Sequence, residues 1–133
     1  MNETQSILDN NVDNDQKNIM VVDTAPLMQS ILGSIIVGGG YKFTRTKSEK
    51  NALRLVEAYK PDLLIVRADT PDMDGYDLAE KLNSSGNTAP IIFMSDNVTK
   101  EGVIKAHRMG VKDYITNPVD GKVVLSKIAK QLA

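Results

Sequence analysis

The side chains of this sequence that could do chemistry belong to polar residues that follow short apolar runs. They are Asp23, Thr24, Arg67, Ser95, Asp96 and Asn117. Carboxylates can hold Mg²⁺ or accept a phosphoryl group, and a hydroxyl can contact phosphate. A guanidinium can neither ligate the metal nor accept the phosphoryl group, because it is a permanent cation and no nucleophile at neutral pH. The set therefore combines carboxylate, hydroxyl and amide groups with one permanent cation.

Composition removes several other classes of function. The 133 residues include no cysteine and a single histidine, His107, which excludes disulfide scaffolds, thiol nucleophiles and cysteine-type zinc sites. The formal net charge of −1 creates no overall field that would attract nucleic acid. The apolar runs fall far short of the ~20 residues of a transmembrane helix, and the first residues do not form a secretory signal. We expect a cytoplasmic protein with no membrane segment and no nucleic-acid partner.

The apolar pattern predicts the elements that position these residues. Apolar or half-apolar runs predict strands at 19–22, 41–46, 63–66, 91–94 and 112–116. Apolar residues at helical spacing predict helices that begin near Pro26, Ser48, Gly75, Thr99 and Asp120. Strict alternation of five strands and five helices predicts an α/β fold, a doubly wound parallel sheet with helices on both faces. Ligands of such folds lie beyond the carboxyl ends of the strands, which is where the six polar residues fall.

The charge is uneven along the chain. Residues 1–18 hold one lysine against four acidic residues, a net −3, and the remainder holds fifteen basic and thirteen acidic residues, a net +2. The first segment is too polar to bury enough apolar area to offset its ordering entropy. We predict a flexible N-terminal tail at residues 1–17 and one domain at 18–133, with a partner-binding arm built on Ile7 and Leu8 as the alternative.

Short motifs recur in a fixed order from residue 19 to residue 132. They are Ile19-Met-Val-Val-Asp23, Pro26-Leu-Met, Gly40-Tyr41, Ala52-Leu53, Lys60-Pro-Asp62, Pro71-Asp-Met-Asp-Gly75, Ala89-Pro-Ile-Ile92, Gly110-Val-Lys-Asp-Tyr114 and Asn117-Pro118. In order and spacing they resemble the receiver domain of bacterial two-component response regulators. The resemblance implies a flavodoxin-like sheet of strand order 2-1-3-4-5 and a role in phosphorelay signalling.

The resemblance also shows where this chain departs from the family pattern. A working receiver implies an acidic pair that holds Mg²⁺, an acceptor aspartate, a Ser or Thr, and a lysine. Matched onto this sequence, the acidic pair is Asp23-Thr24, the acceptor position is Arg67, the hydroxyl is Ser95, and the lysine position is Asn117. Asp96 stands where the family usually has a small residue. We interpret these residues as a degenerate phosphorylation site that binds no metal or other cofactor, in a non-enzymatic pseudo-receiver.

The substitutions suggest that a side chain of the protein balances the charge of the site in place of a metal ion. We expect Arg67 to lie within salt-bridge reach of Asp23 or Asp96, so that its guanidinium balances the charge that magnesium would otherwise offset. The alternative is that Arg67 reaches out to solvent and the site has simply decayed.

Two other functions stay open at this point. Asp69 could accept phosphate as an atypical acceptor in a phosphorelay, since it lies two residues beyond Arg67. A small doubly wound enzyme or flavin-binding domain is the other, although residues 24–27 lack the hydroxyl- and glycine-rich phosphate loop of a flavodoxin-like carrier. Asp72 and Asp74 are expected to serve the turn and the N-terminus of the following helix.

The resemblance further implies an output surface formed by the fourth helix, the fifth strand and the fifth helix. Ser95 and Tyr114 occupy the hydroxyl and aromatic positions that couple this surface to phosphorylation, and Lys105 and Asp113 belong to it as well. Tyr114 either packs as a half-buried aromatic or sets a partner surface fixed in one state. The partners we expect are proteins, a histidine kinase or an output domain among them, with a homodimer through this surface as a further possibility.

Overall fold

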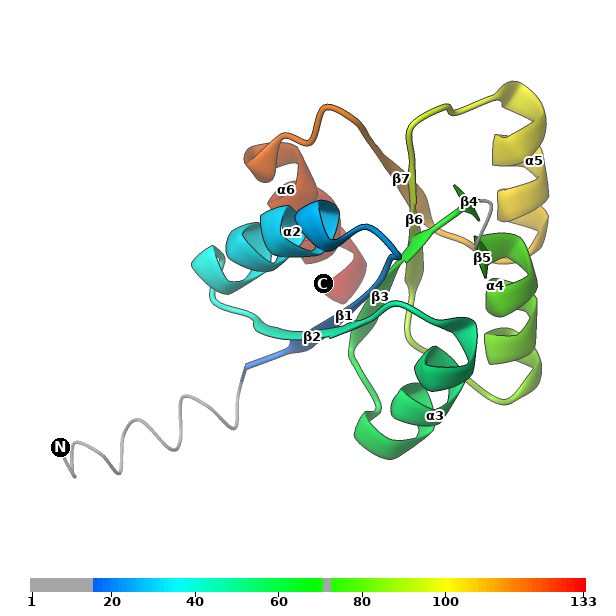
Figure 1. Ribbon diagram of the computed structural model, residues 1–133, viewed down its shortest axis with the longest axis horizontal. Helices are drawn as coiled ribbons and strands as arrows, with labels where there is room; N and C mark the ends of the chain where they lie inside the picture. The colour runs from blue at the N-terminus through cyan, green and yellow to red at the C-terminus, as the bar shows by residue number, and fades with distance from the viewer. Residues whose placement is uncertain (1–15, 71–72) are drawn as a thin grey trace, which may run out of the picture.

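A five-stranded parallel sheet forms the centre of the computed structural model, which describes residues 16–70 and 73–133 (Figure 1). Its strands are β1 (Asn18–Val22), β2 (Lys42–Thr46), β3 (Leu63–Arg67), β6 (Ile91–Ser95) and β7 (Asp113–Thr116). They lie in the order β2-β1-β3-β6-β7, and every neighbouring pair is parallel. In order along the chain this is 2-1-3-4-5, so the predicted doubly wound α/β fold is confirmed.

Five helices within the described residues cover both faces of the sheet. They are α2 (Pro26–Gly38), α3 (Glu49–Tyr59), α4 (Gly75–Ser84), α5 (Lys100–Arg108) and α6 (Gly121–Leu132). Helices α2 and α6 share one face, and α3, α4 and α5 cover the other (Figure 1). Every residue of β3 and β6 is buried, which explains why their sequences are apolar without alternation. None of these helices has the length and apolar character needed to cross a bilayer.

Four of the helices begin at a side chain that caps their free N–H groups. Ser48 and Thr99 each accept from the N–H three residues on, at the starts of α3 and α5. Asp74 and Asp120 each accept from two N–H groups, at the starts of α4 and α6. Such caps satisfy donors that have no partner inside the helix. The capping role expected for Asp74 is confirmed, whereas Asp72 lies outside the described residues.

The segment between β3 and α4 contains a short antiparallel ladder that the apolar pattern did not predict. Its two strands are β4 (Asp69–Thr70) and β5 (Met73–Asp74). Gly75 follows directly, and its N–H donates to the Ala68 carbonyl at 2.9 Å. A Cβ at Gly75 would lie only 2.2 Å from the carbonyl oxygen of Arg67. The glycine therefore allows α4 to begin directly against the end of β3.

The two described residues that precede β1 already contact the domain. The Lys42 N–H donates to the Lys17 carbonyl at 2.8 Å, and the Gln16 side chain donates to the Gly40 carbonyl at 3.1 Å. Residues 16 and 17 are therefore attached to the sheet edge. The rest of the tail predicted at 1–17, with Ile7 and Leu8, lies outside the described residues.

Candidate functional site

The parallel sheet brings the six polar residues to the same edge. Arg67 and Ser95 are the last residues of β3 and β6, and Asp23 directly follows β1. Asn117 directly follows β7. Because the carboxyl ends of parallel strands all lie on the same side of the sheet, residues far apart in the chain meet there.

Two carboxylates bind the Arg67 side chain. Its Nε donates to Asp23 Oδ2 at 3.1 Å, and its Nη1 donates to Asp96 Oδ1 at 3.0 Å. Arg67 is 6% exposed and Asp23 is 1% exposed, so this half of the network is buried. The expected ion pair is confirmed, and the alternative of a solvent-directed Arg67 is wrong.

Both oxygens of Asp23 have donors. Oδ2 faces Arg67, and Oδ1 accepts from the N–H of Ala25 at 2.9 Å. A buried carboxylate needs such partners, because burying an uncompensated charge is costly. The carboxylate that would help to hold a metal in a standard receiver is here committed to the protein itself.

Asp96 joins Arg67 to Asn117. The Asn117 side-chain amide donates to the same oxygen of Asp96 that Arg67 contacts. Hydrogen bonding from Arg67 is the main cause that lowers the pKa of Asp96, and Asn117 adds to it, while partial burial opposes both. The Asp96 side chain is 67% exposed, so water also solvates this end of the network. Sequence reasoning gave Asn117 only a lost function; the structure gives it a contact.

Ser95 and Thr24 lie beside the network and have no bond to it. The buried Ser95 hydroxyl accepts from the N–H of Asn97 at 3.1 Å. Thr24 is half-buried and lines a neighbouring cavity. Asp69 is exposed in β4, and its negative charge contributes to raising the pKa of Tyr114. The structure thus joins four of the six predicted residues, Asp23, Arg67, Asp96 and Asn117.

The donor set does not fit Mg²⁺. This ion requires several hard oxygen ligands in near-octahedral geometry. Both oxygens of Asp23 already accept hydrogen bonds, from Arg67 and Ala25, and Thr24 and Asn117 carry no charge. In the described part of the chain no group of three or more acidic or histidine side chains is arranged to hold a metal ion.

Gln29 supports the site, although sequence reasoning passed over it. Its side-chain N–H₂ donates to the carbonyls of Asp23 at 2.9 Å and Thr46 at 2.8 Å, and the residue is 5% exposed. It therefore ties α2 to the ends of β1 and β2. The available signal was a polar residue on the apolar face of a helix, between Met28 and Leu32.

An aromatic cluster occupies the predicted output surface. The Tyr114 hydroxyl donates to the Gly102 carbonyl at 2.9 Å and lies 3.2 Å from the Tyr76 hydroxyl. Phe93 contacts both tyrosine rings edge-on. Burial, and next the hydrogen bond with Tyr76, raise the pKa of Tyr114. Tyr114 is therefore half-buried, points toward the start of α5 and is held by hydrogen bonds.

Lys105 and Asp113 also lie at this surface, and each has a partner within the chain. The Lys105 ammonium sits 4.5 Å from the centre of the Tyr76 ring. Asp113 pairs with Lys127 of α6 at 2.9 Å, and Lys127 also donates to the Tyr114 carbonyl at 2.6 Å. The Lys105 contact joins α5 to α4, and the Lys127 contacts join α6 to β7.

Comparison with known proteins gives the family. A model of the response regulator receiver domain matches residues 19–129. The chain belongs to that family. This receiver domain is 32% identical to the chemotaxis protein CheY of Bacillus subtilis, over 86% of its own length and 96% of that protein. It is also 32% identical to CheY of Treponema pallidum, over 86% and 81% of the two chains.

Solved structures agree on the fold of this receiver domain. Chemotaxis protein CheY4 of Vibrio cholerae superposes with a TM-score of 0.83 at 15% identity, covering 88% of this chain and 99% of CheY4. A CheY-like receiver domain protein of Methanospirillum hungatei gives 0.82 at 24% identity, covering 89% and 94%. At these identities the likeness concerns the fold alone.

Proposed function

We propose that this receiver domain signals without being phosphorylated, as a pseudo-receiver whose shape is read by protein partners. The observation that carries the proposal is that Arg67 stands at the acceptor position with its guanidinium bound to Asp23 and Asp96. Arginine has no carboxylate to form an acyl phosphate. Its charge also repels the divalent cation that phosphoryl transfer to such a site requires.

The energy of the ion pair supports this proposal. Opposite charges at ~4 Å attract by about 4 kcal/mol at an effective dielectric constant of 20, before the cost of desolvation. A metal ion would have to displace a guanidinium that is already in contact with Asp23. We propose that the network keeps the site in one charge state.

The surface around Tyr114 supports recognition by a protein. Apolar side chains of α5, α6 and the loop before α5 are exposed by 39–46% there, namely Val98, Val103, Ile104 and Val123. Receiver domains act with histidine kinases and output domains, and we propose that such a partner in the cytoplasm docks on this surface. The second candidate partner for this surface is another copy of the same chain, which would form a homodimer. We propose no catalytic activity. Of the flexible tail predicted at residues 1–17, we keep the part before Gln16 as a proposal.

Treatment with a small phosphodonor tests the proposal. We expect that acetyl phosphate with Mg²⁺ leaves the intact mass unchanged, because no carboxylate stands at the acceptor position. Intact-protein mass spectrometry would detect an added phosphoryl group as about 80 Da. A phosphorylated species that disappears in Asp69→Asn would contradict the proposal and favour the atypical acceptor.

A matched variant controls the experiment. Arg67→Asp alone restores an acceptor but neither the second acidic residue nor the lysine, so it should stay unmodified. Arg67→Asp combined with Thr24→Asp and Asn117→Lys rebuilds the family pattern and should gain the mass. Phosphorylation of Arg67→Asp alone at the rate of the triple variant would refute the claim that Thr24 and Asn117 also prevent phosphorylation.

A further inference from the structure

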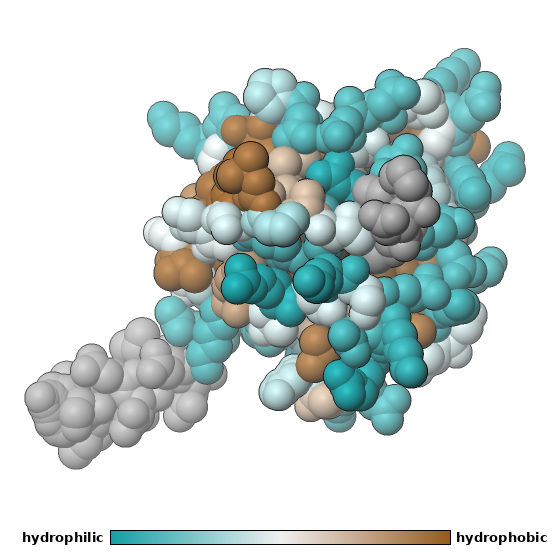
Figure 2. Space-filling model, viewed as in Figure 1, coloured by the Kyte–Doolittle hydropathy of each residue, from teal (hydrophilic) through white to brown (hydrophobic). Residues whose placement is uncertain are grey.

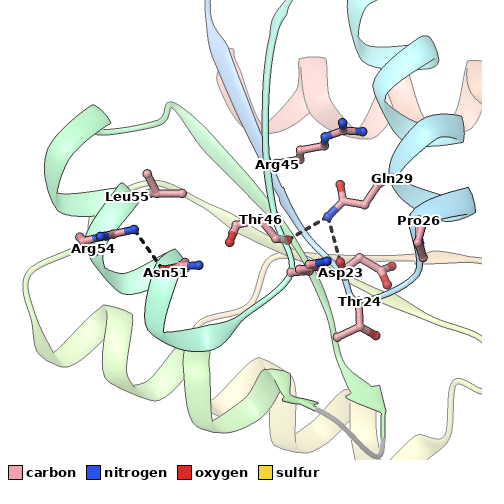
Figure 3. Close-up of a pocket in the computed structure, with 10 residues that line it drawn as sticks. Asp23, Thr24, Pro26, Gln29, Arg45, Thr46, Asn51, Arg54 and Leu55 are labelled. Atoms are coloured by element: carbon pink, nitrogen blue, oxygen red, sulfur yellow. Dashed lines mark hydrogen bonds between the residues drawn. The ribbon is translucent and has the colours of Figure 1, made fainter.

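A cavity of about 480 Å³ lies beside the Arg67 network, between α2, α3 and the ends of β1 and β2 (Figure 3). Its lining residues are Asp23, Thr24, Pro26, Gln29, Arg45, Thr46, Lys47, Asn51, Arg54 and Leu55. Small-molecule sites in proteins typically enclose about 300–1,000 Å³. The cavity therefore has the size of a ligand site, and the pseudo-receiver function does not use it.

The lining of this cavity is positively charged. It includes Arg45, Lys47 and Arg54, and none of the three is within salt-bridge distance of a carboxylate in residues 16–70 and 73–133. The single acidic residue of the lining is Asp23, whose charge Arg67 already balances. Arg67 thus offsets the negative charge of Asp23 that would otherwise oppose an anion here.

The charged groups approach the cavity from opposite walls. Figure 3 shows Arg45 beside Gln29 on the α2 side, with Asn51 and Arg54 on the α3 side. Arg54 Nη2 donates to Asn51 Oδ1 at 3.0 Å, which restricts where the guanidinium lies. Figure 2 shows strongly hydrophilic side chains gathered on this face between α2 and α3. An anion placed between the walls would therefore meet donors from two sides.

Uncharged groups complete the walls. Pro26 and Leu55 offer apolar contact, and Thr24 offers a hydroxyl. Gln29 is buried, its N–H₂ is bound to backbone carbonyls, and its amide oxygen has no hydrogen-bond partner in the described part of the chain. That oxygen is free to accept from a donor if the wall shifts. The mixture fits a molecule with an anionic group and an apolar or hydrogen-bonding body.

We propose that this cavity binds a phosphate-bearing organic anion of about the size of a mononucleotide. A forked guanidinium group, such as those of Arg45 and Arg54 on the two walls, matches the oxygens of a phosphate, and Lys47 adds a third positive charge to the lining. The body of the ligand packs against Pro26 and Leu55. This site adjoins the degenerate phosphorylation site and shares Asp23 and Thr24 with it, but here the ligand is bound and no group is transferred.

Calorimetric titration with AMP and with adenosine tests the proposal on the full chain. We expect AMP to bind and uncharged adenosine to bind at least roughly tenfold more weakly, because only AMP carries the phosphate. Raising the salt concentration from about 50 to about 500 mM should weaken AMP binding, since the contacts are electrostatic and partly exposed. Amide resonances of Thr24, Thr46 and Asn51 should shift during the titration. No heat with AMP, or equal affinity for adenosine, would overturn the proposal.

Two double variants with the same change of charge separate the cavity from the rest of the surface. Arg45→Ala with Arg54→Ala should weaken AMP binding by roughly tenfold or more, at an unchanged melting temperature, because both side chains are exposed. Arg108→Ala with Lys130→Ala removes two exposed charges elsewhere and should change the affinity less than about twofold. Equal loss in both variants would mean binding by general charge and would refute the site. The outcome is independent of the phosphodonor experiment, which does not involve these residues.

Discussion

Arg67 is a buried cation at the end of a central strand. Its ion-pair partners determine how much free energy its burial costs. A buried ion pair gains little over apolar residues of the same shape, since both charges lose hydration. Removing one partner is much more costly, because the other charge stays buried alone. Asp23 is in that position, at 1% exposure and with Arg67 as its one charged partner in the described part of the chain.

Arg67→Ala should therefore destabilise the domain. We expect a loss of about 3 kcal/mol in the free energy of unfolding, measured by urea denaturation at neutral pH. Arg67→Lys keeps the charge and should lose less. Lys81→Ala breaks half-exposed surface pairs with Glu49 and Asp77 and should cost much less than Arg67→Ala, because water screens such pairs. Equal stability of Arg67→Ala and the native sequence would contradict the structural role of the pair.

Asp96 predicts a dependence of stability on pH. Arg67 lowers its pKa in the folded state below the ordinary value of 3.8. The stabilisation is thus fully present above the unfolded value and is lost as pH falls through the lower folded value. Asp96→Asn should reduce stability slightly at neutral pH, and the difference should shrink below about pH 4, as paired denaturation curves would show. A difference that grows on acidification would refute this assignment.

At the scale of elements, the junction between β3 and α4 positions the site. Gly75 packs against the carbonyl oxygen of Arg67 and the backbone of Ala68, which leaves no room for a side chain at position 75. The backbone that carries Arg67 is therefore fixed by the start of α4 as well as by the strands on either side. Substitution at this junction should affect both the stability and the network.

Gly75→Ala should destabilise the domain by about 2 kcal/mol or more, because its methyl group would overlap backbone atoms that cannot yield. Gly38→Ala is the matched control. Position 38 is the last residue of α2, and a Cβ there meets nothing within 4 Å. The control should be neutral or gain up to about 1 kcal/mol. Thermal unfolding of the two variants compares them directly, and equal melting temperatures would count against the packed junction.

The elements were predictable from sequence to different degrees, for physical reasons. Apolar runs such as 63–66 predicted buried strands, because only a strand covered on both faces needs such a run. The short ladder of β4 and β5 was missed, since strands of two residues show no periodicity. The ion pair followed from charges at matched strand ends. The cavity did not, because Gln29, Arg45 and Arg54 share no motif and meet only through the packing of α2, β2 and α3.

At the scale of the whole molecule, the network and the cavity lie at one edge of the sheet, and the proposed docking surface occupies α5, β7 and α6. Figure 2 also shows an apolar patch over α2, where Leu27 and Ile31 are exposed by 73% and 37%. In the state that we propose, in which the guanidinium of Arg67 takes the place of a metal at the central site, the stability of the molecule should not respond to divalent cations.

Thermal unfolding with and without MgCl₂ measures that response. We expect no shift of the melting temperature at about 10 mM MgCl₂ beyond that caused by NaCl of equal ionic strength. The variant with Thr24→Asp, Arg67→Asp and Asn117→Lys should be stabilised, by about 1.4 kcal/mol if magnesium is present at tenfold its dissociation constant. Specific stabilisation of the native sequence by magnesium would show that Arg67 yields to the metal.

The contact of Phe93 with Tyr76 and Tyr114 has a consequence for spectroscopy. The chain has no tryptophan, four tyrosines and two phenylalanines, so this one cluster holds half of its aromatic rings. Near-ultraviolet circular dichroism and tyrosine emission of the unlabelled protein will therefore be weighted toward the side formed by α4, α5 and β7. A binding partner that settles on that side can be followed by its optical signal, without attaching a dye.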